Sequence, residues 1–323
     1  MKFSSLLLLA TTGLLSTAPA VHGIEPLSLN KRIVGGTAIT TTKYNFAVRL
    51  NIKSGTSDYL CGGTLLADDL VVTAGHCMHN ADTNTVYSST SVAVCYGSPN
   101  VSEMSCTTAR SISLHPNYNP LTYANDIALI QISQLKSGFN ILPVYTGKVP
   151  ESTVLTTMGW GKTVDTSIKL PATLMAVDIM VGGAATCKKA EGSFVNSDGP
   201  EICSVNSLTP GKDSCQGDSG SPAIITADDG KTYLVGLTSA GVDLKDPTAA
   251  TCATANGIAF YTHINYFMSF ITANSGRPAS FFYGQGEEDT GDASSSQSKS
   301  AASKSVIVGG GALVAAIAAA IVF

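Results

Sequence analysis

The sequence predicts an all-β protein, arranged either as two barrels or as a sandwich. The segment 46–52 places a large apolar residue at every second position, which is the period of a half-buried strand. The segments 70–72 and 127–132 are short apolar runs that suit strands buried on both faces. The runs 223–225 and 233–235 flank an Asp-Asp-Gly turn, which is a signal for a β-hairpin.

Composition sets the limits of this prediction. The chain has 323 residues, of which 44% are hydrophobic and 13% charged, so it can bury a large core and is too apolar to be disordered. A helical period occurs near the end of the predicted strands, where Ile264, Phe267, Met268 and Ile271 fit one face of a terminal helix. The formal net charge of -4, without a basic block, argues against a nucleic-acid partner.

The first twenty residues have the pattern of a secretory signal peptide. Lys2 precedes the apolar run 6–10, and Ala18-Pro19-Ala20 is a small-residue cleavage site. A transmembrane helix is the weaker interpretation, because the apolar run is short and is followed by Thr, Thr and Gly. We therefore expect residues 1–20 to be removed and the rest of the chain to enter an oxidising compartment.

All eight cysteines lie outside the predicted signal peptide. An even number of cysteines in a secreted chain predicts disulfides, although spacing alone does not decide which residues pair. The competing interpretation is a zinc site at Cys61, His76 and Cys77. We favour disulfides because the chain has no Cys-x-x-Cys pair, and we expect neither a metal nor any other cofactor.

The segment 211–222 carries the strongest chemical signal in the chain. Small residues flank Ser219, so a tight turn can present its hydroxyl, and the backbone N–H groups of Gly217 and Ser219 can point together at a developing oxyanion. A serine hydroxyl needs a base to take its proton and a third group to orient that base. His76, followed by Cys77, and Asp126, at the head of an apolar run, are the candidates.

These residues occur in the order His, Asp, Ser, and together with the Ile-Val-Gly-Gly motif at 33–36 they resemble the trypsin-like serine proteases of the chymotrypsin family. The resemblance extends from Ile33 to about Gly276. It implies two six-stranded antiparallel β-barrels, about 33–145 and 146–276, followed by a C-terminal helix. The first barrel would supply His76 and Asp126, the second barrel would supply Ser219, and the active site would lie between them.

The same resemblance implies how the substrate is bound. Asp213 stands six residues before Ser219, where trypsin-like members carry the acid of the pocket that accepts arginine or lysine. The resemblance also implies substrate-binding roles for three other residues, namely Ser214, Ser239 and Gly241. The expected partners are therefore protein or peptide substrates with Arg or Lys before the cleaved bond, and protein inhibitors.

The segment 21–32 ends in Lys31-Arg32, directly before the Ile-Val-Gly-Gly motif. The resemblance implies that 21–32 is a propeptide, cut after Arg32 by an activating protease. The new ammonium of Ile33 would then pair with the buried Asp218 and order the oxyanion site, because an isolated buried carboxylate is costly. The uncut chain is therefore expected to be a nearly inactive zymogen.

The chain departs from the family pattern at several positions. Gly75 stands where the family usually has Ala, Ser221 where it has Gly, and Ala240 where it has Trp, which leaves the subsites beyond the first pocket without their usual aromatic wall. Either Gly257 or Ala259 would line the wall of the first pocket, and an alanine there would narrow it.

The resemblance also proposes a disulfide pairing. Three pairs follow the family pattern, and the fourth would be an additional link on a loop. The four expected pairs are Cys61 with Cys77, Cys187 with Cys203, Cys215 with Cys252, and Cys95 with Cys106. The triplet that starts at Asn100 lies between Cys95 and Cys106 in the sequence and is an acceptor for N-glycosylation.

The C-terminal part changes character after Gly276. Residues 277–305 are predicted to be a flexible polar linker, and residues 306–323 are an apolar tail that runs to the last residue. A polar spacer before such a tail fits the signal for a GPI anchor, with attachment near 292–295. The alternative is a transmembrane helix, which we disfavour because no basic cluster follows it. Release by a phosphatidylinositol-specific phospholipase would separate the two.

Two functions follow from the sequence. The first is a secreted or cell-surface serine endopeptidase, made as a zymogen, which cleaves after Arg or Lys through an acyl-enzyme. The second is a catalytically silent relative that uses the same cleft or its loops for binding. The presence of His76, Asp126, Ser219, Asp213 and Gly217 favours the endopeptidase.

Overall fold

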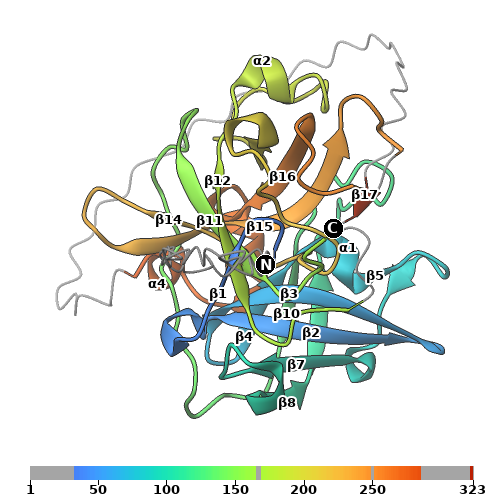
Figure 1. Ribbon diagram of the computed structural model, residues 1–323. Coiled ribbons are helices and arrows are strands. Elements are labelled where there is room, and N and C mark those ends of the chain that lie inside the picture. The colour runs from blue at the N-terminus through green and yellow to red at the C-terminus, as the bar shows by residue number, and fades with distance from the viewer. Residues whose placement is uncertain (1–32, 165–168, 249–250, 285–320, 323) are drawn as a thin grey trace, which may run out of the picture. The chain divides into compact units, whose positions relative to one another are not determined.

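Two antiparallel sheets carry most of the secondary structure in the described residues (Figure 1). The computed structural model describes residues 33–164, 169–248, 251–284 and 321–322. The predicted signal peptide, the propeptide with Arg32, and the linker and apolar tail between 285 and 320 lie outside the described residues.

The first sheet contains seven strands. In their order across the sheet they are β8 (Ser105–Thr108), β7 (Val92–Tyr96), β2 (Ala47–Ser54), β3 (Ser57–Ala67), β4 (Leu70–Thr73), β10 (Ala128–Gln131) and β9 (Ser111–Leu114). Strands β8 and β9 are two halves of one bent segment. Ala109 N donates to Val92 O at 2.9 Å and Arg110 N donates to Gln131 O at 2.7 Å, so the bent segment joins the two ends of the sheet. The sheet thereby closes into a barrel.

The second sheet closes in a similar way. Its path runs through β1 (Thr37–Ala38), β12 (Met175–Met180), β11 (Val154–Gly159), β14 (Pro222–Thr226), β15 (Thr232–Asp243), β16 (Gly257–His263) and β13 (Glu201–Val205), and β17 (Ile321–Val322) pairs with β15. An antiparallel bridge between Val181 and Ser204 connects the end of β12 to β13, and Gly182 N donates to Cys203 O at 2.9 Å. The predicted all-β class with two β-barrels is confirmed.

Short elements connect these strands. Among the described residues they are the strand pair β5 (His79–Asn80) and β6 (Thr85–Val86), the helices α1 (Gly75–Met78), α2 (Ala184–Cys187), α3 (Met268–Ser275) and α4 (Ala279–Phe282), and the 3-10 helices Thr42–Tyr44, Ser89–Ser91, Val101–Glu103, Asn206–Leu208 and Ile264–Phe267. The expected C-terminal helix is present as the last of these 3-10 helices followed by α3. It ends at Gly276, whose φ of 70° is the left-handed conformation that closes many helices.

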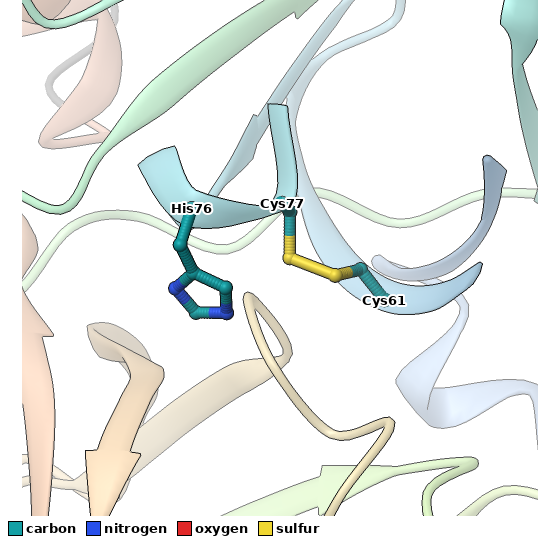
Figure 2. Close-up of side chains that lie close together, drawn as sticks. All are labelled: Cys61, His76 and Cys77. Carbon is teal, nitrogen blue, oxygen red and sulfur yellow. A yellow bond between two sulfur atoms is a disulfide. The ribbon is translucent and has the colours of Figure 1, made fainter. Parts of the chain in front are cut away.

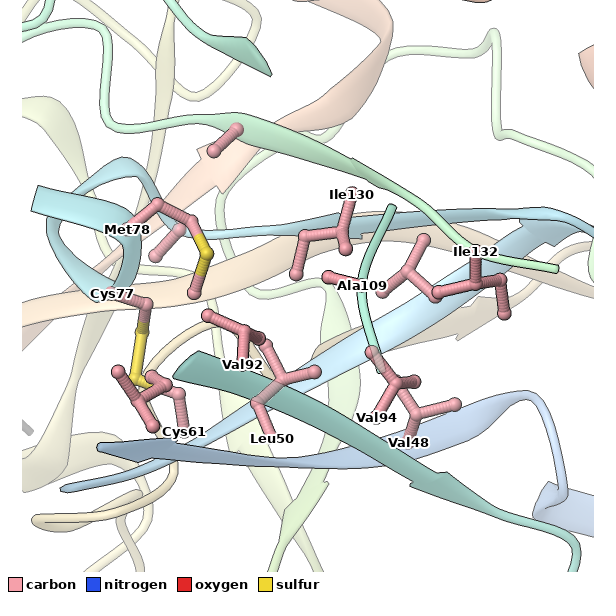
Figure 3. Close-up of a cluster of buried hydrophobic side chains, with 14 of the residues drawn as sticks. Val48, Leu50, Cys61, Cys77, Met78, Val92, Val94, Ala109, Ile130 and Ile132 are labelled. Carbon is pink, nitrogen blue, oxygen red and sulfur yellow. A yellow bond between two sulfur atoms is a disulfide. The ribbon is translucent and has the colours of Figure 1, made fainter. Parts of the chain in front are cut away.

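Each barrel has its own apolar core, and a third apolar cluster joins them. Figure 3 shows the first core, where Leu50 and Val94 pack between the strands with Ile130. The third cluster brings residues of β4 and β10 together with Leu234 and Leu237 of β15 and the buried face of α3. The four apolar residues predicted to form one helix face are all buried there. Burial of this face attaches the terminal helix to both barrels.

Residues 277–284, the first part of the predicted polar linker, contact the rest of the chain. Arg277 forms an ion pair with Asp69, with 2.7 Å between Nη2 and Oδ1, and Phe282 of α4 is only 3% exposed. Val144 N donates to Phe282 O at 2.7 Å. Residues 277–284 therefore pack on the barrels, held by the burial of an aromatic side chain and by an ion pair that composition does not reveal. No helix in the described residues is long and apolar enough to cross a membrane.

The four disulfides have the expected partners. They are Cys61–Cys77, Cys95–Cys106, Cys187–Cys203 and Cys215–Cys252. The pair Cys95–Cys106 is a direct link between two paired strands, since these cysteines face each other in the register of β7 and β8. It therefore fixes the edge of the first sheet and is not a link on a loop.

Candidate active site

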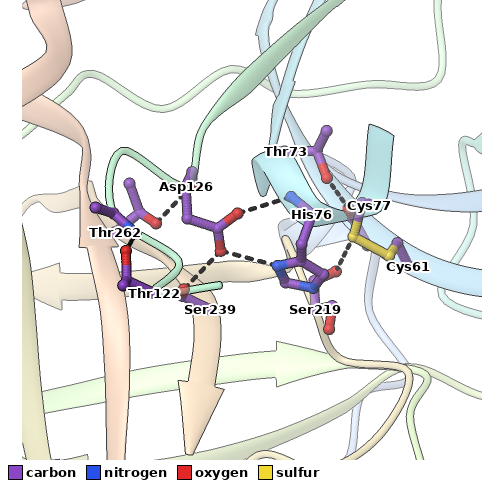
Figure 4. Close-up of polar contacts among 11 residues, drawn as sticks. Cys61, Thr73, His76, Cys77, Thr122, Asp126, Ser219, Ser239 and Thr262 are labelled. Carbon is purple, nitrogen blue, oxygen red and sulfur yellow. Dashed lines mark hydrogen bonds and ion pairs between the residues drawn. A yellow bond between two sulfur atoms is a disulfide. The ribbon is translucent and has the colours of Figure 1, made fainter. Parts of the chain in front are cut away.

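His76 and Asp126 meet because their strands are neighbours. β4 ends just before α1, which carries His76, and β10 begins just after Asp126, while Thr73 and Ala128 are register partners in the antiparallel pair. Nδ1 of His76 lies 2.8 Å from Oδ2 of Asp126, and the backbone N–H of His76 donates to Oδ1 at 2.7 Å (Figure 4). One carboxylate therefore holds both the backbone and the ring of the histidine.

The second barrel completes the environment of Asp126. Ser239 Oγ donates to Oδ2 of Asp126 at 2.6 Å, and Thr262 Oγ1 donates to its carbonyl oxygen at 2.8 Å. Asp126 is only 3% exposed. Because a carboxylate accepts hydrogen bonds and does not donate them, Nδ1 of His76 carries a proton, and in the neutral ring Nε2 is the acceptor. Nε2 is buried and has no hydrogen-bond partner among the described residues.

Ser219 lies in the loop before β14, where both barrels hold its backbone. Gly62 N of β3 donates to Ser219 O at 2.7 Å, and Gly220 N donates to Thr238 O of β15 at 2.7 Å. The Sγ atom of Cys77, the residue after His76, lies 3.6 Å from the same Ser219 carbonyl. Figure 4 shows the Ser219 side chain beside the imidazole of His76. The predicted base, its orienting carboxylate and the serine thus come together across the two barrels.

The turn before Ser219 depends on glycine. Gly217 has a φ of 96°, a conformation that residues with a Cβ rarely adopt. A Cβ on Gly217 would lie 3.0 Å from Cα of Gly161, which is closer than ordinary packing. The backbone N–H groups of Gly217 and Ser219, predicted to form the oxyanion site, therefore occupy a turn that a larger residue would distort.

The side chain of Asp218 is bound by backbone groups of the second barrel. Its carboxylate is fully buried and accepts hydrogen bonds from Gly161 N at 2.8 Å and from Cys215 N at 2.9 Å. Burial raises the pKa of Asp218 to about 7, although these hydrogen bonds act in the opposite direction. Asp218 has no ion-pair partner among the described residues. Ile33 is also fully buried, in the core that contains Cys215.

Asp213 is a second buried acid in the segment before Ser219. It is 3% exposed, and its Oδ2 accepts hydrogen bonds from Asn206 Nδ2 at 2.7 Å and from Ala253 N at 3.0 Å. Next to it, Ser214 Oγ lies 3.1 Å from the hydroxyl of Tyr261. Asn206 has no local sequence pattern to show that its side chain reaches an acid seven positions later.

The pairing of β15 and β16 distinguishes the two candidate wall residues. Gly241 lies opposite Ala259, whereas Gly257 lies opposite Asp243. Both candidates share the face of β16 on which Tyr261 reaches Ser214, so the register partner distinguishes them: only Ala259 lies opposite Gly241. Strand β17 pairs antiparallel with Gly241 and Ala240. This part of β15 therefore has backbone groups that accept an added strand.

Two of the three ligands of the alternative zinc site are joined to each other in the structure. The ligand atoms of Cys61, His76 and Cys77 lie within 4.8 Å of one another, but the two cysteines form a disulfide (Figure 2). A disulfide offers no thiolate to a metal, and His76 is engaged with Asp126.

Tyr123 is an additional residue near the site. Its ring packs edge-on against His76 with 5.4 Å between ring centroids. Burial and the charge of Asp126 raise the pKa of Tyr123 to about 12, so its phenol is neutral at physiological pH. In the sequence, only its position three residues before Asp126 could have pointed to a place near the site.

The predicted glycosylation acceptor Asn100 directly precedes the short 3-10 helix Val101–Glu103, and its Nδ2 donates to Oε1 of Glu103 at 3.2 Å.

The departure at Ser221 has an energetic consequence. Its Oγ is buried without a hydrogen-bond partner among the described residues. We expect Ser221→Ala to raise the free energy of unfolding by about 1 kcal/mol, because the substitution removes an unsatisfied buried hydroxyl. Thermal and denaturant unfolding measure this change. Ser214→Ala is the matched control and should destabilise the protein, since Ser214 Oγ is bonded to Tyr261; a loss of stability in Ser221→Ala would contradict the expectation.

Comparisons with known proteins agree with this architecture. The family model for trypsin matches residues 33–271. Serine protease 1 of Rattus norvegicus is 31% identical over 253 residues, which cover 76% of this chain and 91% of that protein. Brachyurin of Leptuca pugilator is 31% identical over 251 residues, covering 76% and 99%. Trypsin of Sarcophaga bullata is 30% identical over 227 residues, covering 69% and 84%.

Proposed function

Because the chain belongs to the trypsin family of serine proteases, we propose that it is a secreted or cell-surface endopeptidase, made as a zymogen, that cleaves proteins after arginine or lysine. The observation that carries this proposal is that Asp126 binds His76 at two points. The Asp126 carboxylate lies 2.7 Å from the backbone nitrogen of His76 and 2.8 Å from Nδ1 of its ring, and this ring lies beside Ser219. A protein that only bound a ligand would not need an imidazole whose tautomer is fixed.

The proposed mechanism uses these three residues in turn. Nε2 of His76 takes the proton of Ser219 while Ser219 Oγ attacks the substrate carbonyl, and His76 then gives that proton to the leaving amine. Asp126 keeps the proton on Nδ1 and stabilises the charged ring. Water repeats the same steps on the acyl-enzyme. The N–H groups of Gly217 and Ser219 bind the oxyanion, and in comparable sites the loss of one donor costs roughly 2.7–4 kcal/mol.

Substrate selection is assigned to Asp213 and to the strand β15. A buried carboxylate at the base of a pocket favours a cationic side chain before the cleaved bond. Ser214 and Gly241 would line this pocket, and Ala259, the register partner of Gly241, would make the pocket narrower than a glycine at that position would. Ser239 to Gly241 would pair with the backbone of the substrate, and the antiparallel pairing of β17 with Ala240 and Gly241 supports that mode of binding.

We assign activation to a cut after Arg32 by another protease. Ile33 has a φ of 40°, which is strained for a β-branched residue. Cutting the preceding bond removes this restriction and frees an ammonium next to the core in which Ile33 is buried. Asp218 is a buried carboxylate with a raised pKa, and such a group gains from a cation. Residues 1–20 would direct secretion, and the C-terminal tail would tether the enzyme to the cell surface.

The test is hydrolysis of short peptide amides by protein cut after Arg32. We expect cleavage after Arg and Lys and at least a hundredfold slower cleavage after an isosteric uncharged residue, because only the cations satisfy Asp213. Ser219→Ala should lose this activity while keeping its unfolding temperature. Equal rates with the uncharged substrate, or full activity in Ser219→Ala, would contradict the proposal.

A further inference from the structure

The acid of the proposed pocket has a protein partner of its own. Asn206 Nδ2 donates a hydrogen bond of 2.7 Å to Oδ2 of Asp213, and Ala253 N donates to the same oxygen at 3.0 Å. Because a carboxylate can only accept, the amide must present its nitrogen to Asp213. Two donors therefore converge on one oxygen of the carboxylate.

This arrangement limits what Oδ2 can offer to a substrate. A carboxylate oxygen has two favourable lone-pair directions, and the two donors occupy both. A third donor at Oδ2 would compete with the hydrogen bond from Asn206, a residue that is only 1% exposed. The carboxylate cannot then present both of its oxygens to one ligand.

Arginine and lysine respond differently to this limit. A guanidinium is a planar fork that binds a carboxylate best through two parallel N–H···O bonds, one to each oxygen. An ammonium is a compact point charge on a flexible stem, and it needs only one oxygen of the carboxylate. A pocket in which Oδ2 is already engaged therefore loses more affinity for arginine than for lysine.

The position of Asn206 is supported by a neighbouring glycine. Asn206 is the first residue of the 3-10 helix Asn206–Leu208, which directly follows β13. A Cβ on Gly257 of β16 would lie only 2.4 Å from Asn206 Nδ2. A glycine at this position therefore leaves the space that the amide fills beside Asp213.

We propose that Asn206 is a specificity-determining residue, which shifts the preference of the pocket from arginine toward lysine by occupying Oδ2 of Asp213. The inference rests on the proposed function of Asp213 as the acid of that pocket. Wild-type enzyme should cleave after lysine at least as fast as after arginine.

The experiment uses the full chain cut after Arg32 and two peptide amides that differ only in Arg or Lys before the cleaved bond. The readout is the ratio of kcat/KM for Arg to that for Lys. Asn206→Ala should raise this ratio about tenfold, since it releases one charge-assisted hydrogen-bond position for the guanidinium. Gly257→Ala should raise it too, because the added methyl group displaces the amide.

Asn45→Ala is the matched control. Asn45 is also a buried asparagine, and its Nδ2 donates to the carbonyls of Gly97 and Gly138 in a part of the chain remote from Asp213. This substitution should lower the unfolding temperature without changing the ratio. A purely structural role for Asn206 would give the same result in Asn206→Ala.

Inhibition gives a second readout that does not need turnover. Benzamidine carries two nitrogens in a planar fork, whereas butylamine carries an ammonium. In Asn206→Ala the inhibition constant of benzamidine should fall relative to that of butylamine. If Asn206→Ala does not fold, Asn206→Ser and Gly257→Ala decide the question. An unchanged Arg-to-Lys ratio in the folded variants would overturn the inference alone, whereas wild-type enzyme that cleaves neither peptide would overturn the proposed function and this inference with it.

Discussion

Replacing Asp126 by asparagine should lower kcat by about 10⁴ at neutral pH without unfolding the protein. An asparagine can keep its oxygen toward the backbone N–H of His76, which now contacts Oδ1 of Asp126 at 2.7 Å. Its NH₂ group then replaces Oδ2 and donates to Nδ1 of the ring. The ring proton moves to Nε2, and the histidine can no longer accept the proton of Ser219.

The measurement is kcat and KM for a peptide amide with cut wild-type and variant enzymes. KM should change little, because Asp126 would not contact the substrate. Asp69→Asn is the matched control: Asp69 is a carboxylate in an ion pair with Arg277 outside the candidate site, so this substitution should leave kcat unchanged. Ser239→Ala removes one donor from Oδ2 of Asp126 and should lower kcat by only about tenfold. An Asp126→Asn enzyme that retained a tenth of the wild-type kcat would contradict the proposed role.

The elements that could be predicted from the sequence are those whose local pattern agrees with their burial. The alternating segment 46–52 lies in or next to β2, and the buried face of the terminal helix was visible as Ile264, Phe267 and Ile271. The prediction that His76, Asp126 and Ser219 lie close together rested on the family resemblance. Spacing along the chain does not show which strands become neighbours.

What could not be predicted depends on contacts between distant segments. The packing of 277–284 involves the ion pair between Arg277 and Asp69, two residues far apart in the sequence, so the composition of this segment suggested a linker. Asn206 has no sequence signature of its own, and its proposed role follows only from its hydrogen bond to Asp213. Gly75 shows the same limit: a Cβ there would lie 3.2 Å from Oδ1 of Asp126, so the glycine eases the close approach of that carboxylate.

Cutting the chain after Arg32 should reverse the effect of pH on stability, because the cut changes the partner of Asp218. In the uncut chain, burial raises the pKa of Asp218 from 3.8 to about 7. The folded chain then holds a proton that the unfolded chain has lost, so the free energy of unfolding falls as pH rises from about 4 to about 7. One pH unit corresponds to about 1.4 kcal/mol, which makes the total loss about 4 kcal/mol.

In the cut chain the Ile33 ammonium would pair with Asp218 and lower the pKa of that carboxyl. Stability should then rise with pH above the acid range, and it should fall again, together with activity, once the pH passes the raised pKa of the ammonium, which is roughly 7.7–8 when unpaired. Loss of one partner of a buried pair costs about 3–5 kcal/mol, so Asp218→Asn should reduce the activity of cut enzyme by a factor on the order of 10² to 10³.

The decisive comparison is unfolding at pH 5 and pH 7.5 of the uncut chain, stabilised against processing by Arg32→Gln, and of the cut chain. Each is measured with and without Asp218→Asn, which isolates Asp218 from Glu201, another carboxyl whose pKa burial raises to about 7. The difference in the free energy of unfolding between wild-type and Asp218→Asn proteins should have opposite signs in the uncut and the cut chain. The same pH dependence in both forms would show that Ile33 does not reach Asp218, and the activation step would have to act through another group.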